Sequence, residues 1–156
     1  MAGQESDESP PRVARLSERS ANWAWAQAAK ETDSYKEFWT FIADSLAKNL
    51  AVTEMIARFA ARGFARSDAE RLVWTAVVTA IETSQMEDMI RMEADRNLRI
   101  LKSWSTRKDE QACEACRANE AQGWIGLNEL FQSGHRCPPA HVGCRCASLF
   151  KASGRK

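Results

Sequence analysis

The stretch that decides how this chain folds begins at Cys113-Glu-Ala-Cys116 and ends, after a glycine-containing spacer, with His135-Arg-Cys137-Pro-Pro-Ala-His141-Val-Gly-Cys144-Arg-Cys146. All five cysteines of the 156-residue chain lie in this stretch, whereas cysteines used only for core packing would scatter along the sequence. The N-terminal residues are acidic and lack the apolar segment of a secretory signal, so we expect the thiols to stay reduced. Clustered, reduced thiols indicate metal ligation rather than disulfides.

Two pairs of donors in this stretch have the spacing of a metal-binding knuckle. Cys113 and Cys116 are separated by two residues, and so are His141 and Cys144. This spacing lets a tight turn direct both side chains at one ion, and zinc binds four such donors tetrahedrally. We therefore predict a structural zinc site formed by Cys113, Cys116, His141 and Cys144. Cys146 is the alternative ligand, because Cys144-Arg-Cys146 also brings two thiols together.

The remaining donors of the stretch fit a metal site less well. His135 and Cys137 lack the knuckle spacing, so we regard them only as possible replacements for a first-choice ligand. A complete, thiolate-rich set of four ligands indicates a closed site, whereas a catalytic zinc keeps one position open for water. We therefore predict no catalytic residue. The acidic side chains of this region are expected to be solvated: Glu114, Glu120 and Glu129.

Working outward, glycine and proline interrupt the sequence after Trp104, and the segment is too short to fold by apolar burial alone. The predicted fold class is mostly α: a helical body with a long helix, followed by a small zinc-stapled module of loops and short strands. The expected divisions are a disordered arm at residues 1–13, a helical domain at 14–104, the zinc-binding module at 105–150 and a basic tail at 151–156.

The helical body is predicted from apolar residues that recur at three- and four-residue spacing. One stripe begins at Phe38, a second covers residues 52–62, and a third runs from Val73 to Leu101. Ser67 and Glu70 have the spacing of a capping box at the start of the third helix. Unbroken to Trp104, that helix would be about 54 Å long at about 1.5 Å per residue, so it either projects or bends near residues 83–85. No strand is predicted before residue 105.

Three methionines in the long helix permit two interpretations. Met86, Met89 and Met92 share one side of the predicted helix. Methionine fills irregular core gaps, and it also forms adaptable binding surfaces. Core packing is the favoured interpretation, and a strip that binds a partner is the alternative.

Composition excludes several functional classes. The chain has 22 basic and 21 acidic residues, a net charge of +1, so bulk charge gives no reason to expect nucleic acid or a membrane surface as partner. No apolar run is long enough to cross a bilayer. Only local charge, such as Arg145 between two cysteines, offers a contact for phosphate.

The C-terminal pattern resembles the phage Mu F-like head morphogenesis, or minor head protein, family. The residues that carry the resemblance form W-x-T-x-x-D-x-x-x-C-x-x-C and P-P-x-H-x-x-C-R-C: Trp104, Thr106, Asp109, Cys113, Cys116, Pro138, Pro139, His141, Cys144, Arg145 and Cys146. The resemblance covers about residues 50–150. The chain departs from the family where Arg-Thr-Glu is common, because it has Trp74-Thr75-Ala76. It is also shorter than typical members, as a compact version or a truncated prophage copy would be.

The resemblance implies a structural, non-enzymatic protein that acts in head assembly of a tailed phage or prophage. The implied partners are portal and capsid proteins, with weak contact to packaged DNA, and with no membrane and no small-molecule substrate. The implied location is the virion, reached from the cytoplasm of the bacterial host. The alternative is a zinc-containing nucleic-acid-binding or nuclease-associated module, which the near-neutral pI of about 7.6 disfavours. A general helical interaction protein is a third possibility.

Overall fold

The computed structural model describes residues 19–24, 33–107 and 112–155, and within residues 33–35 it describes only the backbone. Residues 19–24 are helical. The elements that follow are α2 (Asp33–Ala47), α3 (Val52–Ala60), α4 (Arg66–Arg96), β1 (Leu98–Ser105), α5 (Glu114–Ala121), β2 (Ile125–Gly126) and β3 (Ala147–Arg155). The described chain is thus mostly helical with a small sheet, as predicted. The predicted arm, and residues 14–18 and 25–32 of the predicted helical domain, lie outside the described residues.

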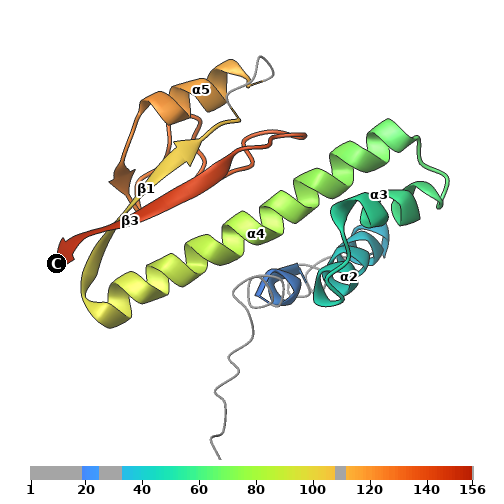
Figure 1. The fold of residues 1–156 in the computed structure, drawn as a ribbon, viewed down its shortest axis with the longest axis horizontal. Helices are drawn as coiled ribbons and strands as arrows, with labels where there is room; N and C mark the ends of the chain where they lie inside the picture. The colour runs from blue at the N-terminus through green and yellow to red at the C-terminus, as the bar shows by residue number, and fades with distance from the viewer. Residues whose placement is uncertain (1–18, 25–32, 108–111, 156) are drawn as a thin grey trace, which may run out of the picture.

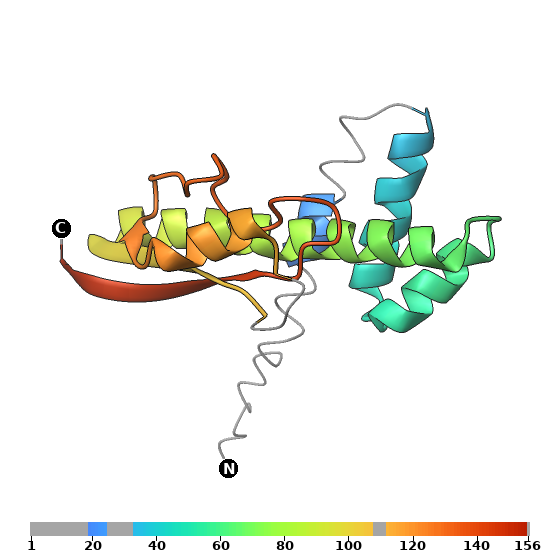
Figure 2. The same ribbon diagram turned by 90° about the horizontal axis from the view of Figure 1, so that it is seen from above.

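Helix α4 is the spine of the molecule. It is a single helix of 31 residues, which corresponds to about 46 Å at about 1.5 Å per residue. Figure 1 shows α2 and α3 beside its N-terminal half, and the sheet with α5 along its other half; Figure 2 shows the same order. The helix therefore neither bends at residues 83–85 nor projects alone. No described helix combines the length and apolarity that a bilayer crossing requires.

The helical body, which we define as α2, α3 and the N-terminal half of α4, encloses an apolar core. Phe59 is its centre, with ring centroids 5.3 Å from Phe38 and 4.5 Å from Phe64. The predicted stripes supply the buried side chains: Ile42, Leu46, Met55, Ile56, Phe59, Val73 and Val77. The predicted capping box is wrong, because α4 begins after Ala65 and no side chain caps it.

The C-terminal elements form the cysteine module, which we define as residues 98–155. Its antiparallel sheet has the order β2-β1-β3, with Trp104 opposite Ser148. The predicted helix up to Trp104 is wrong, because α4 ends at Asn97, whose φ of 50° is left-handed, and β1 follows. The strand places Ile100, Lys102 and Trp104 inward. A lysine in the middle of that alternation hid the strand pattern.

The methionines pack in the interior between α4 and the sheet. Met86 is buried with Ile100 and Leu127, and Met89 and Met92 are partly buried against the same cluster. The core interpretation is therefore confirmed for the side chain of Met86. The predicted domain boundaries stay a prediction, although β3 runs through the segment that we expected to be a basic tail.

Candidate metal centre

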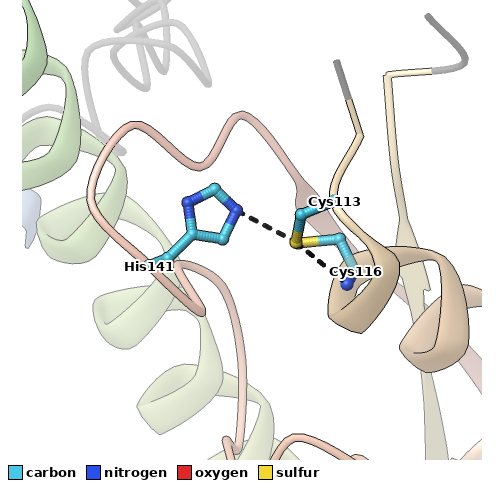
Figure 3. A group of neighbouring side chains, drawn as sticks. All are labelled: Cys113, Cys116 and His141. Carbon is cyan, nitrogen blue, oxygen red and sulfur yellow. Dashed lines mark hydrogen bonds between the residues drawn. The ribbon is translucent and has the colours of Figure 1, made fainter. Parts of the chain in front are cut away.

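The first arm of the centre is the start of helix α5. Cys113 is the N-cap residue of α5, and its Sγ accepts a hydrogen bond of 3.3 Å from the backbone N–H of Cys116. An N-cap side chain that accepts this bond lies on the same side as the residue three positions later. The Cys116 thiol is buried, and Cys113 is half-buried beside it. The Cys-x-x-Cys spacing therefore produces the paired donors that the sequence predicts (Figure 3).

The second arm is the loop that leads into strand β3. The backbone N–H of Cys144 donates to the carbonyl of His141 over 3.1 Å, and Gly143 makes the turn possible with a φ of 81°. A residue with a Cβ is strained at such an angle, so glycine suits this position. Cys144 and Cys146 are buried, with 2% and 7% of their surface exposed, whereas His141 is exposed. The turn brings both cysteines and the histidine to the start of α5.

The donor atoms gather around Cys116. Its Sγ lies 3.5 Å from His141 Nε2 and 3.8 Å from Cys144 Sγ. The donors form two groups within 4.8 Å, one of Cys113, Cys116 and His141 and the other of Cys116, Cys144 and Cys146. The structure thus brings all five candidate ligands together, and Cys116 belongs to both groups. Cys144 does not share the group of Cys113 and His141, so the four first-choice ligands are not all within 4.8 Å of one another.

The imidazole of His141 is oriented as a ligand would be. Its Nδ1 lies 2.9 Å from the carbonyl oxygen of Val142. A carbonyl oxygen only accepts, so Nδ1 carries the proton and Nε2 presents a lone pair towards Cys116. The bond to Val142 is also the main reason why the pKa of His141 is raised. Backbone bonds of this kind fix the ring of metal-binding histidines.

The three buried thiols compete for protons. Hydrogen bonding with Cys146 is the main cause that lowers the pKa of Cys144 to about 5, and the same bond raises the pKa of Cys146. Burial raises the pKa of Cys116 to about 12. Thiolates crowded in a dry site repel one another, whereas a bound cation stabilises all of them. The chemistry of this donor set therefore suits a thiophilic metal ion.

A tryptophan next to the centre leaves a polar atom without a partner. Trp104 is 1% exposed, and its ring centroid lies 5.0 Å from that of Phe131. Its Nε1 is buried and makes no hydrogen bond with any other described residue. The indole N–H would stabilise the ionised form of the Cys146 thiol, and so it opposes the rise in the pKa of that thiol. A buried donor without an acceptor is costly, so an ionised Cys146 would relieve Trp104.

The other predicted substitutes lie outside both donor groups. His135 Nδ1 is 2.9 Å from Ser133 Oγ, in the loop that precedes the second arm. Cys137 packs in the cluster that contains Met86, and burial raises the pKa of its thiol to about 11. Their side chains therefore serve the folding of the loop, in keeping with their unfavourable spacing.

One acidic residue differs from our expectation. Glu120 is half-buried and accepts two hydrogen bonds from Thr106, one of 2.7 Å from Oγ1 and one of 3.3 Å from the backbone N–H. It therefore joins α5 to the end of β1 and is not simply solvated. Glu114 and Glu129 are exposed, as predicted.

Two polar side chains of helix α4, which we did not predict, accept hydrogen bonds from the backbone of the second arm and of strand β3. Thr75 Oγ1 accepts a bond of 2.9 Å from the N–H of Gly143. Glu82 Oε2 accepts a bond of 2.9 Å from the N–H of Ser148, and burial raises the pKa of Glu82 to about 7. The position of Glu82 could have been inferred from the sequence. It lies four residues from both Val78 and Met86 and hence on the inward side of α4.

A buried lysine fixes the loop between the arms. Lys102 is fully buried in β1, and its Nζ donates 2.9 Å bonds to the carbonyls of Leu127 and Arg136. Burial lowers its pKa to about 8. The sequence did not reveal Lys102 because β1 was itself not predicted.

One of three comparisons with known proteins identifies a family for this chain. The family model described as "Phage Mu protein F like protein" matches residues 36–149. This range includes α3, α4, the central strand β1 and both arms of the donor cluster. Neither a search of curated proteins nor a search of solved structures gave a match. The family match covers well over half of the chain, and on this ground the chain belongs to the phage Mu protein F-like family.

Proposed function

We propose that this protein is a structural minor head protein that acts in head morphogenesis of a tailed phage or prophage. The observation that carries the proposal is the family match over residues 36–149, because it includes the helical spine together with the cysteine centre. The protein is assembled into the virion in the cytoplasm of the bacterial host. Its partners are the portal protein, the capsid protein or both, with at most weak contact to packaged DNA.

The metal of the centre is zinc, and its role is structural. In a tetrahedral site with zinc–sulfur distances of about 2.3 Å and zinc–nitrogen distances of about 2.0–2.1 Å, two sulfurs lie about 3.8 Å apart and a sulfur and a nitrogen about 3.5 Å apart. The Cys116–Cys144 and Cys116–His141 distances are 3.8 Å and 3.5 Å. This agreement supports Cys116, His141 and Cys144 as ligands, with Cys113 as the fourth and Cys146 as the alternative.

The protein acts without catalysis. The two donor groups share Cys116 and offer five candidate donors, more than the four that a tetrahedral ion needs, so a bound ion would keep no position open for a substrate or an activated water. Two carboxylates of this region, those of the buried Glu82 and the half-buried Glu120, accept hydrogen bonds that hold the fold together. These contacts support a role in which the module is a rigid part of an assembly.

The test of the proposal is the composition of virions from the phage or prophage that carries this gene. Quantitative mass spectrometry of purified particles should detect the protein in a few copies per particle, and co-expression with the portal protein of the same genome should yield a complex. The matched control is the chain with Cys116→Ser and Cys144→Ser, which should lose that complex. Infectious particles that contain none of the protein contradict the proposal.

A further inference from the structure

A second candidate site lies where the helical body meets the cysteine module. A cavity of about 320 Å³ opens between α3, the first turns of α4 and the cysteine module. Its apolar wall includes Ile56, Trp74 and Val78, and three arginines surround it: Arg66, Arg107 and Arg145. Pockets of this size and of mixed apolar and polar lining are typical of small-ligand sites.

The three arginines have no partners within the described part of the chain. The guanidinium groups of Arg66, Arg107 and Arg145 form no hydrogen bond or ion pair with another described residue, although Glu70 lies in the same wall. Arginines elsewhere on the surface do pair, as Arg58 does with Glu54. Three guanidinium groups that have no partner among the described residues repel each other around one cavity, and an anion relieves that repulsion.

One of these arginines belongs to the loop that carries the candidate metal ligands. Arg145 lies between Cys144 and Cys146, so the knuckle that presents the thiols also sets the position of its backbone. Arg107 and Arg145 also line a smaller cavity of about 90 Å³ that includes Cys113, Cys116 and His141. A metal-loaded centre therefore holds Arg145 in place beside the larger cavity, and binding there is expected to need the metal.

The chemistry of the cavity selects one kind of ligand. A terminal phosphate presents three acceptor oxygens and up to two negative charges, and successive phosphodiesters present two oxygens and one charge each, so either can engage more than one guanidinium. One carboxylate is satisfied by a single guanidinium. The indole of Trp74 provides a flat surface of the kind on which a base stacks. We propose that this cavity binds a nucleoside phosphate unit, with the phosphate among the three arginines and the base against Trp74. This proposal does not depend on a role in phage heads.

The experiment is a set of binding titrations with the zinc-loaded full chain. The probes are fluorescent N-methylanthraniloyl ATP and a short fluorescein-labelled oligothymidylate, with unlabelled ATP, inorganic phosphate and polyglutamate as competitors. The variant Arg66→Gln/Arg107→Gln/Arg145→Gln should weaken binding at least about tenfold. The control Arg99→Gln/Arg117→Gln/Arg155→Gln changes the net charge equally at exposed positions and should alter binding by less than about twofold. Zinc content and helicity measured on each variant establish that it is folded.

A second variant separates the base from the phosphate. Trp74→Leu should weaken ATP and oligothymidylate severalfold while leaving competition by inorganic phosphate unchanged. Tighter binding of ATP identifies a free nucleotide as the source, and tighter binding of the oligonucleotide identifies a single strand; both support the proposal. Competition by polyglutamate as strong as that by ATP overturns it in favour of an acidic protein segment. Equal losses in the two triple variants, or no binding at about 1 mM probe, also overturn it.

Discussion

The helical body and the cysteine module have interiors of different composition. The body buries apolar side chains from α2, α3 and α4 around Phe59. The module buries Trp104 and Phe131 next to three thiols, and it also encloses polar side chains such as Lys102 and Asn119. Apolar burial stabilises the body, whereas the module needs cross-links and a satisfied polar network. The comparison indicates that hydrogen bonds, together with the proposed metal, take the place of a larger apolar core in the module.

The largest expected effect is the loss of the metal. Cys116→Ser removes the donor common to both groups, and structural zinc contributes on the order of 10 kcal/mol to the folding of such modules. We expect about one zinc per chain in the wild type and none in this variant, with amide protection lost in β1, α5 and β3 and retained in α2 and α3. Metal analysis and hydrogen exchange with mass spectrometry measure both.

The control for metal loss is a cysteine outside the donor groups. Cys137→Ala removes a thiol that packs against the methionine cluster, so it should retain zinc and lower stability by only about 1–2 kcal/mol. A Cys116→Ser protein that keeps its module protected against exchange would show that the module does not depend on metal.

A truncation in the apolar core of the helical body should destabilise the body and leave the cysteine module unaffected. Phe59→Ala removes the ring that contacts Phe38, Phe41 and Phe64, and such core truncations cost about 3–5 kcal/mol. We expect this loss in urea unfolding of α2 and α3, with zinc affinity unchanged. Leu130→Ala, at a side chain that is 54% exposed, should cost less than about 0.5 kcal/mol. A parallel fall in zinc affinity would contradict the separation of the two interiors.

The sequence predicted the body well because helical periodicity directly reports apolar burial. Ile42, Met55, Phe59, Val73 and Val77 were expected in a core and are buried together. The strand β1 could not be recognised, because Leu98 and Leu101 also continue the helical spacing and Lys102 breaks the alternation. Its inward lysine is explained only by the carbonyls of a loop far along the chain, which local sequence does not reveal.

The clustering of the candidate donors was likewise predictable, because knuckle spacing is a local property, while the ligand set itself stays a prediction. Cys113, Cys116, His141 and Cys144 were selected on spacing, and the structure brings them together with Cys146. The supports from α4 were not predictable, because Thr75 and Glu82 meet Gly143 and Ser148 across more than sixty residues. The arginine cavity also forms from residues on three separate segments, so no local sequence motif predicts it.

A smaller effect concerns the boundary between the regions and depends on pH. Burial raises the pKa of Glu82 from 4.5 to about 7, so the folded state binds a proton more tightly than the unfolded chain. The stability from this group is therefore complete below about pH 4.5 and is lost as pH rises through about 7, a loss of about 3 kcal/mol. Glu82→Gln keeps an acceptor for Ser148 and should be more stable than the wild type at pH 8.

Denaturant unfolding at several pH values measures this difference. Every other titrating group is common to both proteins, so the difference between their stability curves isolates Glu82. Glu87→Gln, on an exposed position of the same helix, should leave the curve unchanged. Parallel curves for the wild type and Glu82→Gln would mean that Glu82 is not a buried acid at this boundary.

The smallest effect should come from the single bond between Thr75 and Gly143. Thr75→Val preserves the shape of the side chain but removes the oxygen that accepts the Gly143 N–H at 2.9 Å, which costs about 1 kcal/mol. Gly143 lies between His141 and Cys144, so we expect zinc affinity to fall by about fivefold, the change to which about 1 kcal/mol corresponds. Competition with a zinc indicator measures this fall, and Thr75→Ser, which keeps the oxygen, should restore it. Unchanged affinity in Thr75→Val would show that the module binds its metal independently of α4, and the two interiors would then be separate in function as well as in composition.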